Sequence, residues 1–190
     1  HNQFGQLGDG TTIQRRRPGK IVASGVESVA CSNSHTTIVK ANRSLWSMGG
    51  NNYGQLGNGS TTDSSIPVQI ETNGVVEASV GAHHTFYRKT DGSLWTVGHN
   101  GSGQLGDGTT SNRTTPVQIE ASGVVSLADG SHSNTTRYTK SDGSAFAAGG
   151  HHWVTVRCWI ETNPYKLCPQ ELKLYQVVDI LVLYCWSLAN

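Results

Sequence analysis

A short motif that recurs at a fixed spacing constrains the fold of this chain more than any other feature. The sequence Gln-Leu-Gly occurs at residues 6–8, 55–57 and 104–106, so the copies are 49 residues apart each time. Asp-Gly or Asn-Gly follows every copy, and Ser-Leu-Trp at 44–46 and 93–95 keeps the same interval. A constant period of this length is typical of repeat proteins, in which each unit packs mainly against its neighbours.

The repeat divides the chain into units of roughly residues 1–50, 51–99 and 100–150. The third unit carries two additional residues within 131–139, because Ser144 follows Ser93 by 51 residues. After residue 150 the repeat stops and the composition shifts toward Cys, Trp, Tyr and Leu. The sequence therefore predicts a repeat region over 1–150 and an atypical tail over 151–190.

Within a unit, the pattern of apolar residues is that of short strands. Runs rich in β-branched and aromatic residues are bounded by Gly, Asn or Asp, and they span residues 67–70, 75–80, 85–89 and 94–97. Asp91-Gly92 lies between the last two runs and predicts a tight hairpin with a type I′ turn. Four strands per unit predict a four-stranded antiparallel blade of a β-propeller.

Charge, apolar runs and cysteine content limit the kinds of partner and of fold stabilisation that the chain can have. Charged residues make up 14% of the chain and the net charge is +1, which gives no electrostatic reason to expect nucleic acid or an anionic membrane. The longest apolar run, Val177 to Trp186, is too short to span a bilayer, which needs about 20 residues. Only Cys31 lies in the repeat region, so disulfides cannot hold that region together. We expect a protein partner.

The unit at Asp91–Gly108 closely resembles the regulator of chromosome condensation repeat, in particular its bacterial-type members. The resemblance covers residues 1 to about 150 and implies a partial β-propeller of about three blades, from a family that usually closes a ring of seven. The sequence departs from the pattern at Asn42-Arg43, which replaces Asp-Gly, and at Ala145-Phe146, which replaces Leu-Trp. Kelch repeats have a similar period but do not explain the recurring Gln-Leu-Gly.

The repeated side chains are expected to be structural, because one catalytic site would not be copied in every blade. The resemblance places His35 and His84 near the inner end of a blade, rather than in a metal or acid-base site. Trp46 and Trp95 are expected at equivalent, largely buried positions. The repeat also places Gly57 and Gly106 at structural positions. We therefore expect no catalytic residue, no metal and no cofactor.

One match to a nucleotide-binding motif is expected to be accidental. Residues 101–106 fit the G-x-G-x-x-G pattern of dinucleotide sites, but no helix pattern follows them. That pattern works only where a helix N-terminus receives the pyrophosphate. The glycines are interpreted as turn residues.

Arg15, Arg16, Arg17 and Lys20 form the only basic cluster of the chain. The corresponding residues of the next unit, at 64–66 and 69, are uncharged, so the cluster is interpreted as specific to one blade. Two interpretations remain open, a solvated loop and a contact with a partner, because Arg is enriched at interface hot spots.

The function that these features favour is a non-catalytic protein-interaction propeller. Its strands provide a rigid scaffold, and the variable loops Thr11–Pro18, Ser60–Pro67 and Thr109–Pro116 provide the contact face. The resemblance also implies two alternatives, a guanine-nucleotide-exchange-like regulator of a small GTPase and a secreted enzyme inhibitor. A propeller enzyme, such as a lyase or hydrolase, is a further alternative. The compartment, cytoplasmic or secreted, stays open.

The tail has two interpretations. In the first, it is a fourth repeat read out of frame, because codons for residues 155–159, read one base later, can spell the expected Gln-Leu-Gly-x-Gly. In the second, it is a genuine C-terminal element in which residues 175–186 pack as a strand or short helix. We also expect the isolated chain to be marginally stable or to self-associate, because an open propeller keeps unpaired edges.

Overall fold

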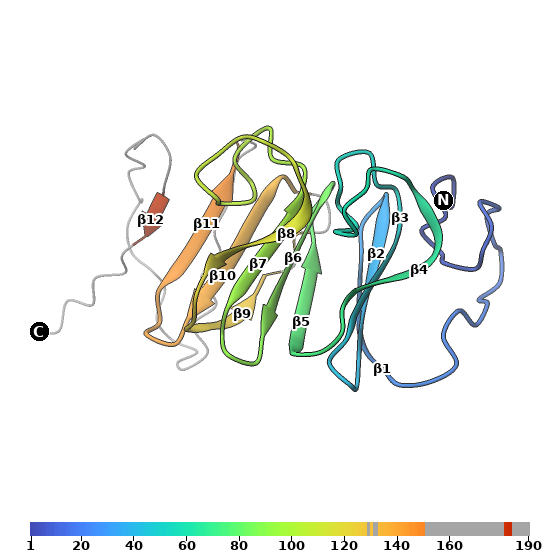
Figure 1. Cartoon of the computed structure of the whole chain (residues 1–190), viewed down its shortest axis with the longest axis horizontal. Helices are drawn as coiled ribbons and strands as arrows, with labels where there is room; N and C mark the ends of the chain where they lie inside the picture. The colour runs from blue at the N-terminus through green and yellow to red at the C-terminus, as the bar shows by residue number, and fades with distance from the viewer. Residues whose placement is uncertain (129, 131–132, 151–180, 184–190) are drawn as a thin grey trace, which may run out of the picture.

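The computed structural model describes residues 1–128, 130 and 133–150, together with the backbone of 181–183. Regular structure in this part of the chain consists of strands, which form three four-stranded antiparallel sheets. Figure 1 shows these sheets standing side by side in chain order along the long axis of the molecule. The architecture confirms a partial β-propeller with one blade per repeat.

In each sheet the strands are hydrogen-bonded in the order in which they occur along the chain. The first sheet contains β1 (Val26–Cys31), β2 (His35–Lys40), β3 (Leu45–Gly49) and β4 (Ser64–Glu71). The second contains β5 (Val75–Val80), β6 (His84–Lys89), β7 (Leu94–Gly98) and β8 (Arg113–Glu120). The third contains β9 (Val124–Leu127), β10 (Thr135–Lys140), β11 (Ala145–Gly149) and β12 (Leu181–Leu183).

Each of the first two sheets takes its fourth strand from the next sequence unit. The predicted strand at 67–70 belongs to β4, which pairs with β3 rather than with β5, and Trp46 lies opposite Gln69. The connections 50–63 and 99–112 join the third strand of a sheet to the fourth, and both lie at one end of the sheets (Figure 1). We call this the loop end; residues 1–14 correspond to the same connection one repeat earlier.

The hairpin between β6 and β7 differs from the prediction. A type I′ turn needs positive φ at two central residues, but only Gly92 has one, at 77°. The N–H of Gly92 donates to Lys89 O at 2.9 Å, and the Asp91 carboxylate accepts the N–H of Ser93 at 2.9 Å. The connection is therefore a type I turn followed by a left-handed glycine, which Asp91 stabilises through its side chain.

The apolar core lies between neighbouring sheets. Between the first and second sheets it consists of buried Val39, Leu45, Val75 and Tyr87. Between the second and third it consists of buried Phe86, Leu94, Val124, Leu127 and Tyr138. Valines at one repeat position thus contribute to both cores. Val26, which holds this position in β1, is 42% exposed, because no described sheet packs against that side of the first sheet.

The third sheet ends on a strand from the tail. Residues 181–183 pair antiparallel with β11, with Leu183 opposite Ala145, so part of the segment predicted as a strand or short helix forms a strand. The out-of-frame hypothesis rests on residues 155–159, which lie outside the described residues.

Candidate functional site

A repeated asparagine shapes each loop at the loop end. Asn2, Asn51 and Asn100 are buried and lie 49 residues apart. The Nδ2 of Asn100 donates to the carbonyls of Thr109 and Ser111 at 3.0 and 3.1 Å, and its Oδ1 accepts the N–H of Leu105 at 3.0 Å. This framework holds the Gln-Leu-Gly segment in place. Sequence reasoning missed these asparagines, although the 49-residue period contains them.

A hydrogen-bonded chain joins the first sheet to the second through His35. The Thr85 hydroxyl donates its single proton to Gln55 O at 2.8 Å, so it must accept from His35 Nε2 at 2.9 Å. Ser32 Oγ lies 3.0 Å from His35 Nδ1 and can donate to it. Burial lowers the pKa of His35 to about 3, with a further contribution from nearby His84, and the ring is therefore neutral.

His84 occupies the equivalent place between the second and third sheets. Its Nε2 lies 3.0 Å from Thr136 Oγ1, and burial lowers its pKa to about 4. Neither His35 nor His84 reaches solvent. The described part of the chain contains no group of three or more His, Cys, Asp or Glu side chains placed to hold a metal ion. In the third sheet, Thr135 is the first residue of β10, the position that His84 holds in β6.

The two tryptophans occupy equivalent environments. Trp46 Nε1 donates to Ser44 Oγ at 2.9 Å, and Trp95 Nε1 donates to Ser93 Oγ at 3.0 Å. A lysine ammonium lies over each ring, at 4.2 Å for the first and 4.7 Å for the second. Both indoles are half-buried rather than largely buried.

The glycines of the repeated motif allow close packing between loop and sheet. Gly57 has φ +80°, and a Cβ there would lie 3.3 Å from Val97 of the second sheet. Gly106 has φ +71°, and a Cβ there would lie 3.2 Å from Ala148 of the third. A larger residue would be strained by its backbone conformation and would also push the loop away from the next sheet.

Three aromatic rings meet at the loop end, Tyr53 from the loop of the first sheet and His83 and His99 next to β6 and β7 of the second sheet. Tyr53 lies 5.2 Å from His83 and 4.5 Å from His99, measured between ring centroids. Burial lowers the pKa of both histidines, and His99 contributes to the effect on His83. The Gln104 amide donates to His99 Nδ1 at 2.7 Å, so the proton of this neutral ring is on Nε2. The corresponding residues of the preceding unit are Phe4, Ser34 and Gly50.

Arg15 has a structural ion pair that recurs two repeats later. Its Nε lies 2.7 Å from Asp9 Oδ2, and the Nε of Arg113 lies 2.8 Å from Asp107 Oδ2. Hydrogen bonds from Thr11 and then Arg15 lower the pKa of Asp9. The interpretation of the basic cluster as specific to one blade is therefore wrong for Arg15, because Arg113 has the same role. The next unit has Ser64 at this position, so the arginine recurs only two repeats later.

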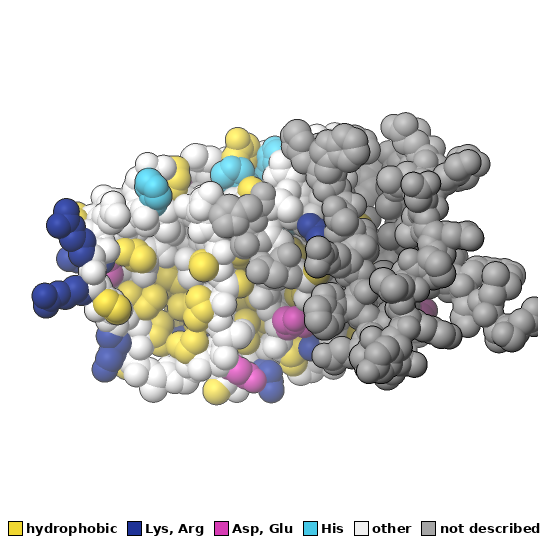
Figure 2. All heavy atoms as spheres, turned by 180° about the vertical axis from the view of Figure 1, so that it is seen from behind, with side chains coloured by type: hydrophobic (Ala, Val, Ile, Leu, Met, Phe, Trp, Pro, Cys, Tyr) yellow, Lys and Arg dark blue, Asp and Glu magenta, His cyan; other side chains and the backbone are white. Residues whose placement is uncertain are grey.

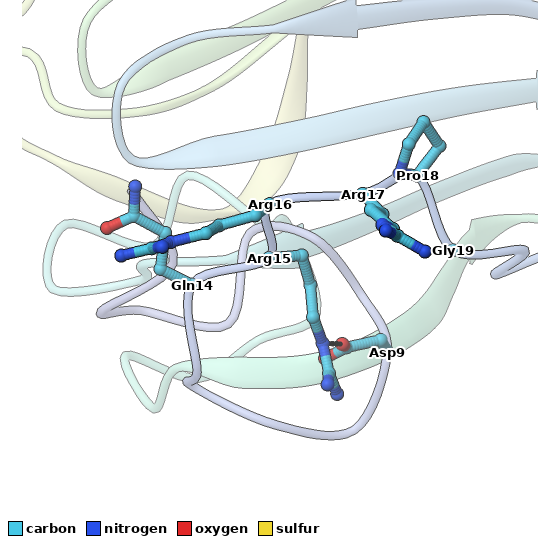
Figure 3. A pocket seen from close by; sticks show the side chains of 7 residues that line it. All are labelled: Asp9, Gln14, Arg15, Arg16, Arg17, Pro18 and Gly19. Carbon is cyan, nitrogen blue, oxygen red and sulfur yellow. Dashed lines mark hydrogen bonds and ion pairs between the residues drawn. The ribbon is translucent and has the colours of Figure 1, made fainter.

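Arg16, Arg17 and Lys20 are exposed, and none has an acidic partner among the described residues. The arginines border an open hollow of about 600 Å³, which is lined by Asp9 and by residues 14–19. Figure 3 shows that the three arginines of the segment diverge: Arg15 points to Asp9, Arg16 lies beside Gln14, and Arg17 lies beside Gly19. The guanidinium groups do not converge on one point.

Comparison with the paired strands shows which of these residues face outward. Arg17 and Lys20 correspond to Ile66 and Gln69 of β4, and to residues 115 and 118 of β8. All four counterparts are exposed, whereas their neighbours are partly covered. Because these positions remain exposed in a fully paired strand, the exposure of Arg17 and Lys20 does not depend on whether segment 15–22 is paired.

Two exposed isoleucines lie near this segment, since Ile13 precedes Gln14 in the chain and Ile66 lies beside Gly10, the neighbour of Asp9. Ile13 is 64% exposed and Ile66 is 57% exposed. Ile66 lies beside Gly10, whose N–H donates to Ser65 O at 2.9 Å. Threonine or serine occupies the same positions in other units, at residues 62, 111 and 115. We call Ile13, Arg16, Arg17, Lys20 and Ile66 the amphipathic patch. Figure 2 shows Lys and Arg side chains at one end of the molecule, beside hydrophobic side chains.

The described residues contain no helix with the length and hydrophobicity needed to cross a membrane. The candidate site has two parts, the amphipathic patch and, at the loop end, the rings of Tyr53, His83 and His99.

Family models match most of the repeat region. One model of the regulator of chromosome condensation (RCC1) repeat matches residues 1–39, 44–87 and 91–135. A second model with the same description matches residues 26–55 and 75–104. No curated protein matches the chain.

Solved propellers share the fold at low sequence identity. Human WBSCR16 is 22% identical with a TM-score of 0.66, over 78% of this chain and 41% of that protein. Yeast RCC1 (Prp20) bound to Kap60 is 19% identical with a TM-score of 0.66, over 78% and 38%. Prp20p from Saccharomyces cerevisiae, in a study that also treats its binding to Gsp1p and histones, is 20% identical with a TM-score of 0.58, over 75% and 35%. The chain thus spans well under half the length of each.

Proposed function

Because the chain belongs to the family of the regulator of chromosome condensation (RCC1) repeat, we propose that it is a protein-interaction propeller that binds a partner protein through its loop end and catalyses no reaction itself. One observation carries the proposal. The asparagine repeats as Asn2, Asn51 and Asn100 and the histidine as His35 and His84, whereas the exposed side chains above this framework differ. A rigid scaffold with variable exposed residues is the arrangement found in many binding surfaces.

The solved neighbours support a protein as the partner. One of them is bound to Kap60, and another is described with its binding to Gsp1p and histones. The exposed residues that vary here include arginine, tyrosine and isoleucine, and the first two are enriched at interface hot spots. A guanine-nucleotide-exchange-like regulator of a small GTPase is the second candidate, supported by the likeness to yeast RCC1 (Prp20).

Site-specific crosslinking tests the proposal. A photoreactive amino acid is placed at position 17 of the full chain, and at the equivalent exposed position 115 as the matched control. We expect a defined protein from extracts of the source cells to crosslink at position 17 and not at position 115. Equal labelling at both positions contradicts a contact specific to the amphipathic patch, and labelling at neither contradicts binding through this surface.

An exchange assay separates the two candidates. The captured partner is identified, and the release of labelled GDP is measured if it is a small GTPase. Release accelerated by the chain supports the exchange-like regulator and contradicts a purely non-catalytic role.

A further inference from the structure

We propose that the amphipathic patch binds an acidic peptide segment that also carries apolar side chains. This inference rests on the proposed protein-interaction function and specifies the chemistry of the partner. The patch combines three cationic side chains with two isoleucines, Ile13 and Ile66, that are exposed by more than half.

The charges of the patch are available to a partner. Asp9 is the acidic residue that lines the hollow, and its carboxylate already accepts from Arg15 at 2.7 Å and from the Thr11 hydroxyl at 2.7 Å. Arg16, Arg17 and Lys20 have no such neutralising contact among the described side chains. A carboxylate-bearing partner supplies the missing counter-charge, and charge complementarity raises the association rate and the specificity of an interface.

The geometry favours an extended partner over a small anion. A single phosphate or sulfate is held by donors that converge on it, but Arg16 and Arg17 point away from each other across the hollow (Figure 3). Lys20 adds a third charge further along the same segment. Several carboxylates spaced along a peptide match this separation, whereas one anion engages only one arginine at a time.

The isoleucines favour a peptide over a nucleic acid. A phosphate backbone gains nothing from the burial of Ile13 or Ile66, whereas covering each isoleucine by an apolar side chain removes exposed apolar surface from water. The whole chain has a net charge of only +1, so it lacks the broad positive field that draws nucleic acid to a protein. The partner is thus expected to alternate acidic and apolar residues.

Fluorescence anisotropy with the full chain tests the inference. The probe is a short labelled peptide in which Glu and Asp alternate with Leu and Val, and a version with Lys in place of the acids is the charge control. A labelled DNA duplex and inorganic phosphate are the competing ligands. We expect the acidic peptide alone to bind, and its affinity to fall as salt is raised.

Substitutions assign the binding to the patch. We expect the double substitution Arg17→Glu and Lys20→Glu to lower the affinity for the peptide by about tenfold or more. The double substitution Ile13→Thr and Ile66→Thr is expected to lower it several-fold. Thr115→Glu with Gln118→Glu places negative charge at the equivalent exposed positions of β8 and is expected to leave binding unchanged. Circular dichroism spectra confirm that each variant is folded.

Three results overturn the inference. They are binding of DNA that the same Glu substitutions abolish, binding of the peptide that they do not affect, and no binding of the peptide. If crosslinking at position 17 still captures a partner while the peptide fails, the proposed function stands and only the acidic, apolar chemistry is wrong.

Discussion

At the hairpin between β2 and β3, one arginine adopts a backbone conformation that glycine adopts in the other sheets. Arg43 has φ 64°, and it is the only non-glycine with positive φ among the described residues. The equivalent residues, Gly92 and Gly143, have φ 77° and 85°. Side chains disfavour this region because Cβ approaches the backbone. The ion pair of Arg43 with Glu27 is solvent-exposed and therefore compensates little.

Arg43→Gly is expected to stabilise the chain by up to about 1 kcal/mol, because relief of the left-handed strain outweighs the extra entropy of glycine in the unfolded state. Urea denaturation measures the change. Gly92→Ala is the opposite control and should destabilise, since a Cβ there lies 2.8 Å from the backbone nitrogen of Gly123. A loss of stability in Arg43→Gly would falsify the account.

The buried histidines predict a pH dependence of stability. Burial depresses the pKa of folded His35 to about 3 and of His84 to about 4, while an unfolded histidine titrates near 6.5. The unfolded state therefore binds more protons below about pH 6.5, and the free energy of unfolding falls between there and the folded pKa values. We expect a loss on the order of 2 kcal/mol per histidine from neutral pH to pH 5.

Denaturation midpoints at a series of pH values measure this dependence. His35→Gln, which keeps a donor near Thr85, is expected to flatten the curve between pH 6.5 and 5. A variant with an unchanged slope would show that His35 titrates normally in the folded state. Asp9, Asp91 and Asp142 have lowered pKa values from hydrogen bonds and contribute only at lower pH.

At the scale of strands and loops, local pattern and pairing carry different information. The runs at 75–80, 85–89 and 94–97 were predictable, because alternation and glycine boundaries mark a strand locally. The pairing of β4 with β3 was not predictable, because the sequence pattern of a strand does not indicate which neighbouring strand it pairs with. The contact between Tyr53 and His99 was not predictable either, because it depends on how the loop of the first sheet packs on the second sheet.

The His35–Thr85–Gln55 chain fixes the loop to the next sheet, so removing its central hydroxyl is expected to be costly. Thr85→Val leaves His35 Nε2 and Gln55 O buried without a partner, at about 2–4 kcal/mol in total. Thr85→Ser keeps the hydroxyl and should cost much less. Equal losses for the two variants would mean that the methyl group, rather than the hydrogen bonds, matters. Thermal unfolding distinguishes these outcomes.

At the scale of the whole molecule, one side of the first sheet is uncovered. Val26 is 42% exposed and Val29 is 58% exposed, whereas Val75 and Val124, which correspond to Val26, are nearly inaccessible. An exposed apolar sheet face next to an unpaired strand edge favours association with other molecules. The repeat alone predicts this surface, because packing in such proteins passes from each unit to the next.

Val26→Thr and Val75→Thr form a matched pair that separates folding from association. We expect Val75→Thr to lower the free energy of unfolding by about 1–2 kcal/mol, since it places a hydroxyl in the core, and Val26→Thr to leave it nearly unchanged. Val26→Thr together with Val29→Thr should reduce self-association, measured by light scattering over a concentration series. A chain that is monomeric at every concentration before substitution contradicts the expectation.

The first two sheets are each shared between two consecutive units, and this has a consequence for how such chains change length in evolution. A duplication or deletion of one 49-residue segment, wherever its breakpoints fall, rejoins a fourth strand to the three strands that precede it. No breakpoint leaves an orphan strand, so recombination within the gene adds or removes whole blades. An insertion of other length, such as the two additional residues of the third unit, keeps the strands in register only if it falls between them. Because a sheet takes its fourth strand from the next unit, the number of blades can change easily, whereas the length of one blade cannot.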